Sequence, residues 1–209
     1  MDYLQQLITR YPQLAGIRDS INRAYTLLIK TFEKKGKLLA AGNGGSAADA
    51  DHIVGELMKG FVKERKAPHE FGAKLASLDA EAGAFLGGHL QQGLPAIALA
   101  NHTALTTACI NDIDGSIIYA QQIYGYGVPG DLFLGISTSG NAKNILYAIL
   151  TAKAKGLKTI ALTGKDGGLI RKHADVSIIV PETETYKIQE LHLPIYHALC
   201  LMLEEYFFS

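Results

Sequence analysis

Residues 38–56 read LLAAGNGGSAADADHIVGE, and this stretch decides the fold. Four apolar residues lead into a turn that contains Gly42, Gly44 and Gly45, and Ser46 then opens a helix. Glycine adopts backbone conformations that other residues disfavour, and the free backbone N–H groups at the start of a helix attract anions. The stretch therefore predicts a buried strand, an anion-binding turn and a helix, in that order.

The predicted helix carries His52 and Glu56 four residues apart. This spacing places an imidazole and a carboxylate on one helical face, beyond the anion-binding turn. Such a pair can share a metal ion or relay a proton. An isolated pair of this kind is more often a surface interaction, so the spacing alone leaves both interpretations open.

The composition indicates one globular domain. The chain has 209 residues, 48% of them hydrophobic and 19% charged, which suits a single α/β domain with a full core. Its 20 basic and 20 acidic residues give no net positive charge, which argues against general nucleic-acid binding. We expect a cytoplasmic protein, because no apolar run of about 18 residues and no signal segment is present. Cys109 and Cys200 stand in apolar contexts and are expected to be buried free thiols.

Five short apolar runs alternate with helical patterns along the chain. The expected strands are 37–41, 96–100, 131–137, 158–163 and 175–180. Helices are expected over most of the first 35 residues and at 103–112, 141–155, 167–173 and 185–206, the last kinked at Pro194. The alternation predicts an α/β fold with a doubly wound, five-stranded parallel sheet. We interpret residues 1–209 as one domain, in which 1–35 form an N-terminal helical extension and 63–95 a helical elaboration with helices at 68–77 and 80–92.

Three of the expected strands end in glycine or small hydroxyl residues. Ligands of open α/β sheets bind beyond the carboxyl ends of the strands. The third strand ends in Ser137, Thr138 and Ser139, whose hydroxyls could hold a phosphate, although one such turn alone would more often be a helix cap. The first turn lacks both the Walker Lys-Ser or Lys-Thr and the third glycine of the dinucleotide motif. Together with a weaker candidate turn at 163–168, the pattern predicts a small phosphorylated ligand rather than a nucleotide.

A second group of polar residues lies on the last predicted helix. It consists of Gln189, Glu190, His192 and His197. Gln189 and His197 are separated by about 12 Å along an ideal helix. The remaining histidines are expected to be structural, namely His69, His89, His102 and His173.

These motifs resemble the phosphoheptose isomerases, a branch of the sugar isomerase (SIS) domain family. The matching segments are 42–46 with His52 and Glu56, 111–112, 135–141, 162–168, and 188–190 with His197. They occur in the family's order and cover nearly the whole chain apart from 63–95. The resemblance implies a flavodoxin-like SIS fold and conversion of sedoheptulose 7-phosphate to D-glycero-D-manno-heptose 7-phosphate through an enediol, in heptose biosynthesis.

The resemblance also implies residue roles and an assembly. Glu56 matches the catalytic base and His197 the acid, and a carboxylate and an imidazole suit the two proton transfers. The substrate contacts match Asn43, Gly44, Gly45, Ser46, Glu56, Asn111, Asp112, Ser137, Thr138, Ser139 and Gln189. One zinc ion per subunit would be held by His52, Glu56, Gln189 and His197. The family's enzymes are homotetramers with active sites at subunit contacts.

Three positions depart from the family's pattern. Ala142 replaces a serine, Tyr186 replaces a frequent aspartate, and Gly60 stands where an arginine is expected, with Lys59 beside it. Two alternatives therefore stay open. One is a non-catalytic SIS module that binds a phosphosugar or a protein, like the relative that associates with the replication initiator. The other is an isomerase for another phosphosugar.

Overall fold

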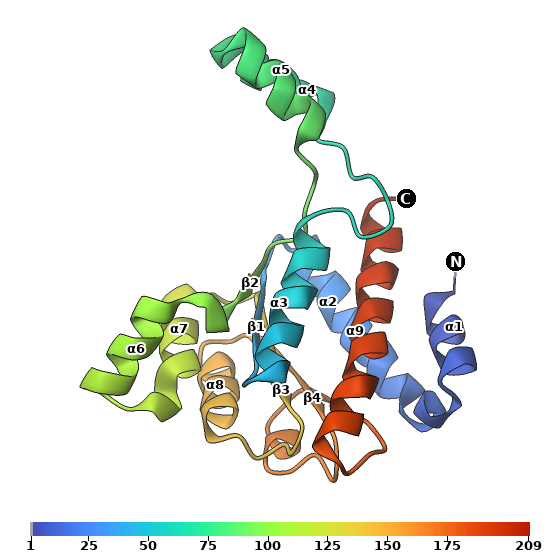
Figure 1. Ribbon diagram of the computed structural model, residues 1–209, viewed down its shortest axis with the longest axis vertical. Coiled ribbons are helices and arrows are strands. Elements are labelled where there is room, and N and C mark those ends of the chain that lie inside the picture. Colours follow the sequence, from blue (N-terminus) through green and yellow to red (C-terminus); the bar gives the residue numbers. More distant parts are fainter. Residues whose placement is uncertain (1) are drawn as a thin grey trace.

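The computed structural model describes residues 2–209, in which five parallel strands form one sheet in the order β2-β1-β3-β4-β5 (Figure 1). The strands are β1 (Leu38–Ala41), β2 (Ala96–Ala98), β3 (Leu132–Ser137), β4 (Lys158–Thr163) and β5 (Val176–Ile179). The predicted doubly wound parallel sheet is confirmed. The chain leaves β1 for one edge and returns to β3 on its other side, so the topological switch point lies between β1 and β3.

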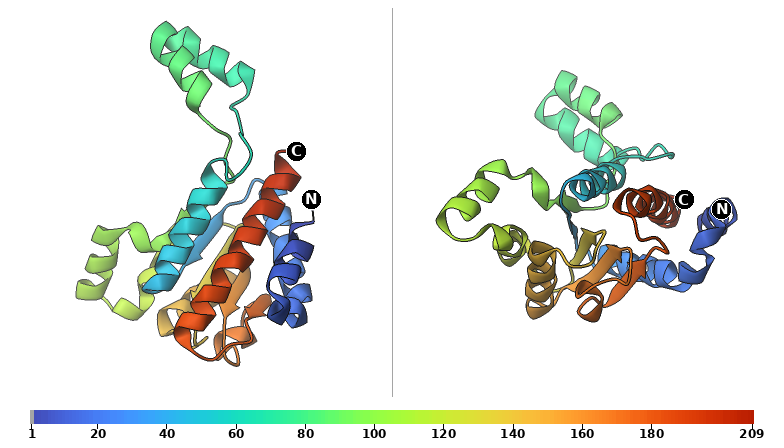
Figure 2. Two further views of the ribbon diagram at one scale, coloured as in Figure 1. Left: turned by 45° about the vertical axis from the view of Figure 1, so that its right-hand side comes forward. Right: turned by 60° about the horizontal axis from the view of Figure 1, so that its bottom comes forward.

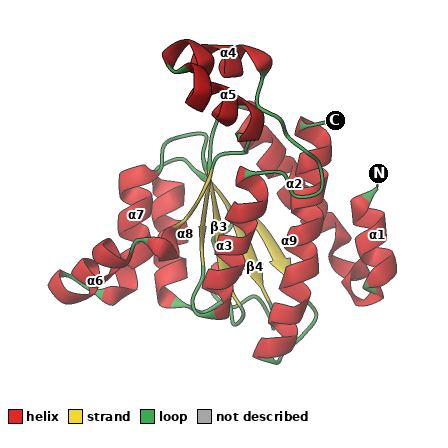
Figure 3. Ribbon diagram, turned by 45° about the horizontal axis from the view of Figure 1, so that its top comes forward, coloured by secondary structure: helices red, strands yellow, loops and turns green. Residues whose placement is uncertain are grey.

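Helices cover both faces of the sheet (Figures 2 and 3). One layer contains α1 (Tyr3–Arg10), α2 (Arg18–Glu33), α3 (Gly45–Met58) and α9 (Thr185–Phe207), and the other α7 (Ile118–Tyr126) and α8 (Lys143–Ala154). Consecutive residues of β1 alternate between the layers: Leu38 and Ala40 belong to one buried cluster, and Leu39 and Ala41 to the other. This pleat explains why the strand is apolar throughout.

The helix α9 lies beside α3 and runs in the same direction, so residues along one helix face residues at a similar height on the other (Figures 1 and 2). The helix continues through Pro194, which has no N–H to donate to the preceding turn. Its packing is extensive: Ile188 and Ile195 are fully buried against the sheet. Burial of this face therefore sustains the helix despite the proline.

Two predicted boundaries are wrong for identifiable reasons. Residues 167–173 form only a 3-10 turn at Ile170–Lys172, because Gly167 and Gly168 have φ values of 80° and 55°, outside the helical region. The expected strand 96–100 ends at Ala98, where the 3-10 turn Leu99–Asn101 begins. The sequence pattern also missed α7, which contains Gly125 and several β-branched or aromatic residues of low helix propensity.

The elaboration contains two helices, as predicted. These are α4 (His69–Leu78) and α5 (Ala80–His89), which form a hairpin that projects from the sheet (Figure 1). The hairpin is tightly closed, since a Cβ atom on Gly87 would lie 3.0 Å from the Cα atom of Gly72. Only Gly83 is buried within the two helices.

A buried ion pair fixes the start of this elaboration. Arg65 donates from Nε to Oε1 of Glu204 over 2.8 Å, and both side chains are almost completely buried. The same carboxylate accepts the backbone N–H groups of Phe61, Val62 and Lys63. The segment after α3 is therefore anchored to the end of α9.

Among the helices of residues 2–209, none combines the length and the hydropathy that a membrane span requires.

Candidate active site

The turn after β1 is shaped by its glycines. Gly44 has a φ of 56°, which favours glycine, and a Cβ atom on Gly42 would clash with the Ser46 carbonyl oxygen. Ser46 is buried in the first turn of α3. A Cβ atom on Gly45 would lie 2.6 Å from Nε2 of Gln189, so this α9 side chain lies against the turn. The structure therefore brings two predicted substrate-binding positions together.

Side chains from the opposite layer support the turn. Asn43 and Asn144 exchange two amide hydrogen bonds of 3.0 and 2.9 Å, and the Tyr119 hydroxyl donates to the Gly42 carbonyl over 2.5 Å. Asn144 and Tyr119 come from α8 and α7, and no short motif in the sequence indicated either contact. The turn is thus held from both faces of the sheet.

The hydroxyl-rich loop after β3 lies at the same edge of the sheet as the glycine turn, because β1 and β3 are parallel neighbours. Ser137 is buried at the end of the strand, and its carbonyl accepts from Gly140. The Ser139 hydroxyl accepts from the Asn141 backbone N–H over 3.2 Å. The two loops flank the switch point, as the sequence predicted, and Thr138 lies between these anchored residues.

The third candidate turn is occupied by the chain itself. A Cβ atom on Gly164 would clash with the Ile188 side chain, and one on Gly140 would clash with the Gly167 carbonyl oxygen. The backbone N–H of Gly164 donates to the Thr138 carbonyl over 3.1 Å. Residues 163–168 therefore buttress the hydroxyl-rich loop.

A cluster of titratable side chains lies between α3 and α9, farther from the sheet edge. Nε2 of His52 is 3.2 Å from Oε1 of Glu56, and the ring centroids of His52 and His197 are 4.9 Å apart. Glu56 is only 14% exposed, whereas His52 is 41% exposed. The predicted base and acid thus lie on facing helices with an imidazole between them.

Two residues that the motifs did not indicate complete this cluster. The Tyr196 hydroxyl lies 3.1 Å from Nδ1 of His52 and donates to Oδ1 of Asp49 over 3.2 Å. Asp49, His52 and Glu56 follow one another at steps of three and four residues, so helical spacing was a signal that could have found Asp49. Tyr196 is buried and stands next to His197 in the sequence.

Burial governs the electrostatics of the cluster. Loss of solvation lowers the pKa of His197, and the neighbouring His52 lowers it further, while Glu56 acts in the opposite direction. Burial also raises the pKa of Asp49, although the hydrogen bond from Tyr196 and the charge of His52 oppose this. Nε2 of His197 is buried and has no hydrogen-bond partner within residues 2–209. A neutral His197 has both a proton to donate and a lone pair to accept one.

Three of the four predicted zinc ligands have side chains that zinc accepts, and they lie in this cluster. His52, Glu56 and His197 supply two nitrogens and a carboxylate, which zinc accepts in proteins. The buried, unpartnered Nε2 of His197 also lacks a protein partner that would compete with a metal. Gln189 lies instead at the glycine turn, about 12 Å along the helix from His197. As placed in residues 2–209, no three His, Cys, Asp or Glu side chains are grouped so as to hold a metal.

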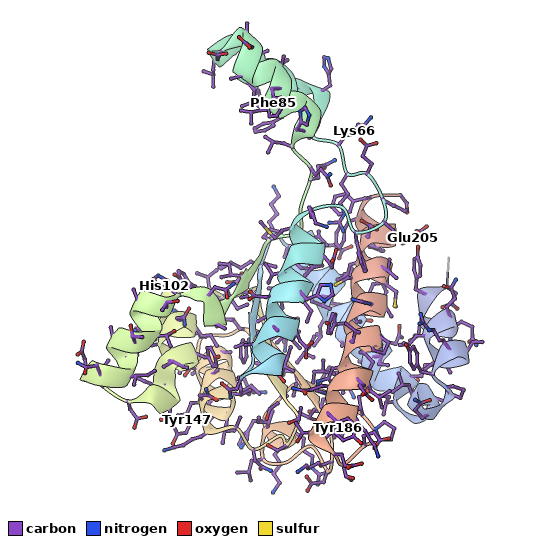
Figure 4. The ribbon with its side chains drawn as sticks, viewed as in Figure 1. Lys66, Phe85, His102, Tyr147, Tyr186 and Glu205 are labelled. Carbon is purple, nitrogen blue, oxygen red and sulfur yellow. The ribbon has the colours of Figure 1, made fainter. Side chains whose placement is uncertain are left out.

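Other predicted site residues lie elsewhere. Asn111 and Asp112 are exposed at the end of α6 (Thr103–Asp112), which leads away from the sheet, and they hydrogen-bond to each other over 2.8 Å (Figure 1). His192 is completely buried, and burial lowers its pKa to about 4 despite a contact with the Thr163 carbonyl. Tyr186 lies exposed at the beginning of α9 (Figure 4). The structure thus separates His192 from the acid–base cluster.

Comparison with known proteins agrees with this architecture. A sequence model of the SIS domain matches residues 76–164. A phosphoheptose isomerase of a Nitratiruptor species is 39% identical over 91% of this chain and 88% of its own length, and one of Helicobacter pylori is 37% identical over 93% and 88%. A phosphoheptose isomerase structure from Francisella tularensis superposes with a TM-score of 0.77 at 30% identity, covering 97% of this chain and 95% of that one. The chain therefore belongs to the phosphoheptose isomerase family of SIS-domain proteins.

Proposed function

We propose that the protein converts sedoheptulose 7-phosphate to D-glycero-D-manno-heptose 7-phosphate through an enediol, as an enzyme of heptose biosynthesis in the cytoplasm. The observation that carries this assignment is the pair of sites along α3: an anion-binding turn at its start and an acid–base cluster farther along. Membership in a family whose named relatives are phosphoheptose isomerases supports the same substrate.

The phosphate end of the substrate is assigned to the switch point. The N–H group of Gly45 at the start of α3 and the hydroxyls of Ser46, Ser137, Thr138 and Ser139 supply donors there, while the N–H groups of Ser46 and Ala47 donate within the turn. The helix α8 begins after Ala142, which makes no side-chain cap, so its first N–H groups also lack a side-chain acceptor from that residue. The missing family hydroxyl at Ala142 therefore leaves backbone donors available to a phosphate.

The distance between the two sites favours a long sugar phosphate. His52 lies six residues beyond Ser46 and Glu56 lies ten, which correspond to about 9 and 15 Å along an α-helix. An extended seven-carbon sugar phosphate spans a comparable length, whereas a triose phosphate is too short to reach from the turn to Glu56. This geometry favours the heptose over smaller substrates of the same class.

Glu56 and His197 are assigned to the two proton transfers. The Glu56 carboxylate takes a proton from C1, and the C–H electrons form the C1–C2 double bond while the C2 carbonyl oxygen gains a proton. His197 delivers a proton to C2, and loss of the C1 hydroxyl proton then leaves the aldehyde. Zinc bound through His52, Glu56 and His197 would supply charge stabilisation to the oxygens on C1 and C2.

The homotetramer remains part of the proposal. Asn111 and Asp112 lie on α6, which also exposes the large apolar side chain of Ile110, and Ile113 follows directly after it. A neighbouring subunit that covers these isoleucines would bury apolar area and place the two polar side chains at a subunit contact. This arrangement supports an active site that is completed by a second chain.

The test is turnover of sedoheptulose 7-phosphate by purified, zinc-supplemented protein, followed by detection of the aldoheptose phosphate. Glu56→Gln should abolish turnover without changing the oligomeric state, because the amide cannot take the C1 proton. Glu81→Gln, at an exposed position of α5, is the matched control and should retain full activity. A Glu56→Gln variant as active as the wild type would show that the base is wrongly assigned.

A further inference from the structure

The hairpin formed by α4 and α5 exposes an apolar face that nothing in the described chain covers. Eight of the ten residues of α5 are Ala, Gly, Phe or Leu. Phe71 and Leu78 stand seven residues apart on α4, and Leu86 and Leu90 stand four apart at the end of α5, so each pair shares one side of its helix. Their exposed fractions lie between 38% and 84%. Figure 4 shows how far the hairpin, marked by Phe85, stands from the rest of the chain.

We propose that this face, defined by Phe71, Leu78, Leu86 and Leu90, packs against the same face of a second copy of the chain. The helices α4 and α5 are antiparallel and touch through Gly72 and Gly87. In this arrangement all four side chains project from the same side of the hairpin. A two-fold axis through that side joins two hairpins into a four-helix arrangement in which each face covers the other.

The distribution of charge favours a second copy as the occupant. Two-fold pairing sets each face against itself, so a charged face would meet like charge. Lys74 comes three residues after Phe71 and four before Leu78, so it borders this face, and Glu70 pairs with it over 2.7 Å. Asp79 caps α5 at Ala82. The four residues that form the face are uncharged and Glu70 neutralises Lys74 at its border, so self-pairing brings no unpaired like charges together.

The apolar area that hairpin pairing would bury is too small to hold two copies together on its own. The four side chains expose roughly 400 Å² per copy, so that a pair covers roughly 800 Å². Specific interfaces generally bury about 1,200–2,000 Å² in total. Hairpin pairing is therefore a secondary contact that strengthens an assembly held by other surfaces, and its loss should shift association rather than unfold the chain.

The test is the association state of the full-length protein as a function of concentration, measured by sedimentation. Leu86→Glu and Leu86→Lys should each weaken association at least tenfold, whereas Glu81→Gln on the outer side of α5 should not. Mixing the two Leu86 variants should restore association, because opposite charges then meet across the pair. Unchanged association in both variants, or no recovery on mixing, would overturn self-pairing. Isomerase activity plays no part in this readout.

A second inference concerns the orientation of His52. A tyrosine hydroxyl has one proton, and Tyr196 donates it to Asp49. The contact of 3.1 Å between Nδ1 of His52 and the Tyr196 oxygen must then be donated by the histidine. We infer that Tyr196 and Asp49 are positioning residues that hold His52 as the Nδ1–H tautomer.

This tautomer has a consequence for Glu56. Nε2 of His52 then carries a lone pair, and it lies 3.2 Å from a carboxylate oxygen of Glu56. Two electron-pair donors face each other at that distance, so the pair is arranged for a cation, either a proton on Nε2 or a metal ion, between or beside them. The inference rests on the proposed function only for the identity of that cation, zinc.

The test is the ¹⁵N NMR signature of His52, assigned by comparison with a His52→Gln variant. Tyr196→Phe removes only the hydroxyl and should convert a single Nδ1–H tautomer into a mixture, with zinc affinity lowered about 10- to 100-fold. Tyr25→Phe, which removes a hydroxyl bonded to the Met202 carbonyl, is the control and should change neither. Asp49→Asn, which keeps an acceptor for Tyr196, should preserve the tautomer. An unaltered tautomer in Tyr196→Phe and in Asp49→Leu would overturn the inference, whether or not turnover is observed.

Discussion

Replacing Glu204 with glutamine tests the buried anchor that positions the end of the acid–base cluster. The Glu204 carboxylate accepts Nε of Arg65 and three backbone N–H groups, all within 2.8–3.1 Å. Burial alone would raise the pKa of Glu204, but these hydrogen bonds and the Arg65 charge outweigh it and hold the pKa below its usual value. Glu204→Gln removes the charge and sets an amide N–H₂ group among donors.

The expected loss follows from the burial of both partners. Arg65 and Glu204 are 0% and 1% exposed, and removing one partner of such a pair leaves an uncompensated buried charge at a cost of about 3–5 kcal/mol. With a urea dependence of about 2 kcal/mol/M, the unfolding midpoint should fall by about 2 M. Glu205, the next residue, pairs with Lys63 at the surface, so Glu205→Gln should lower the unfolding midpoint far less than Glu204→Gln does.

Both variants should be unfolded in urea at one protein concentration, because association adds to apparent stability. Circular dichroism reports the unfolding transition. Because both variants remove one negative charge, the difference between their midpoints measures the effect of burying the ion pair. If Glu204→Gln destabilised the protein no more than Glu205→Gln, the reasoning about a buried, fully hydrogen-bonded carboxylate would be refuted. Phe61, whose N–H this carboxylate holds, lies 5.4 Å from His197 between ring centroids, so activity should fall as well.

Two further outcomes follow from buried positions. Burial lowers the pKa of His192 to about 4, so the folded state binds a proton at His192 less readily than the unfolded state. The free energy of unfolding that results from this difference is fully present above pH 6.5 and declines by about 2 kcal/mol by pH 5. His192→Gln should remove this decline from urea-unfolding curves measured across that pH range. A slope unchanged by the substitution would refute this origin. The new methyl group of Gly42→Ala would clash with the Ser46 backbone and should lower the free energy of unfolding by about 1–3 kcal/mol. That of Gly45→Ala would contact only the far end of the flexible Gln189 side chain, so this variant should lose less stability but show a raised KM. Equal losses of stability in the two variants would contradict this difference.

The sheet was predictable because its central strands β1, β3 and β4 are buried on both faces and read as nearly continuous apolar runs. The strands β1, β3 and β4 lie within one residue of their expected bounds. The helix α7 was missed because its residues have weak intrinsic helix propensity and are stabilised by burial of Tyr119 and Ile123, a tertiary effect. A helix was expected at 167–173, where the structure has only the 3-10 turn Ile170–Lys172, because the conformations of Gly167 and Gly168 depend on the neighbouring loop.

Local motifs indicated the two ends of the site but not the contacts between elements. The glycine turn and the His52–Glu56 pair are each encoded within a few residues. The contact of Tyr196 with His52 joins positions 144 residues apart, and spacing within one segment carries no information about it. Gln189 and His197 share α9 but face different ends of α3, because the two helices run in parallel. The roles assigned to Asn111 and Asp112 stay predictions that depend on a second subunit.

The most direct test of the account is the reaction of sedoheptulose 7-phosphate in D₂O with zinc-supplemented protein, followed by NMR and mass spectrometry of the product. The account predicts an aldoheptose phosphate that carries deuterium at C2, because the C1 proton passes to Glu56 and solvent-exchanged hydrogen is delivered to C2. Failure to form an aldoheptose phosphate would contradict the assigned activity. Product formed with the original C1 hydrogen fully retained at C2 would contradict proton removal by Glu56 and separate, solvent-exchanged delivery by His197.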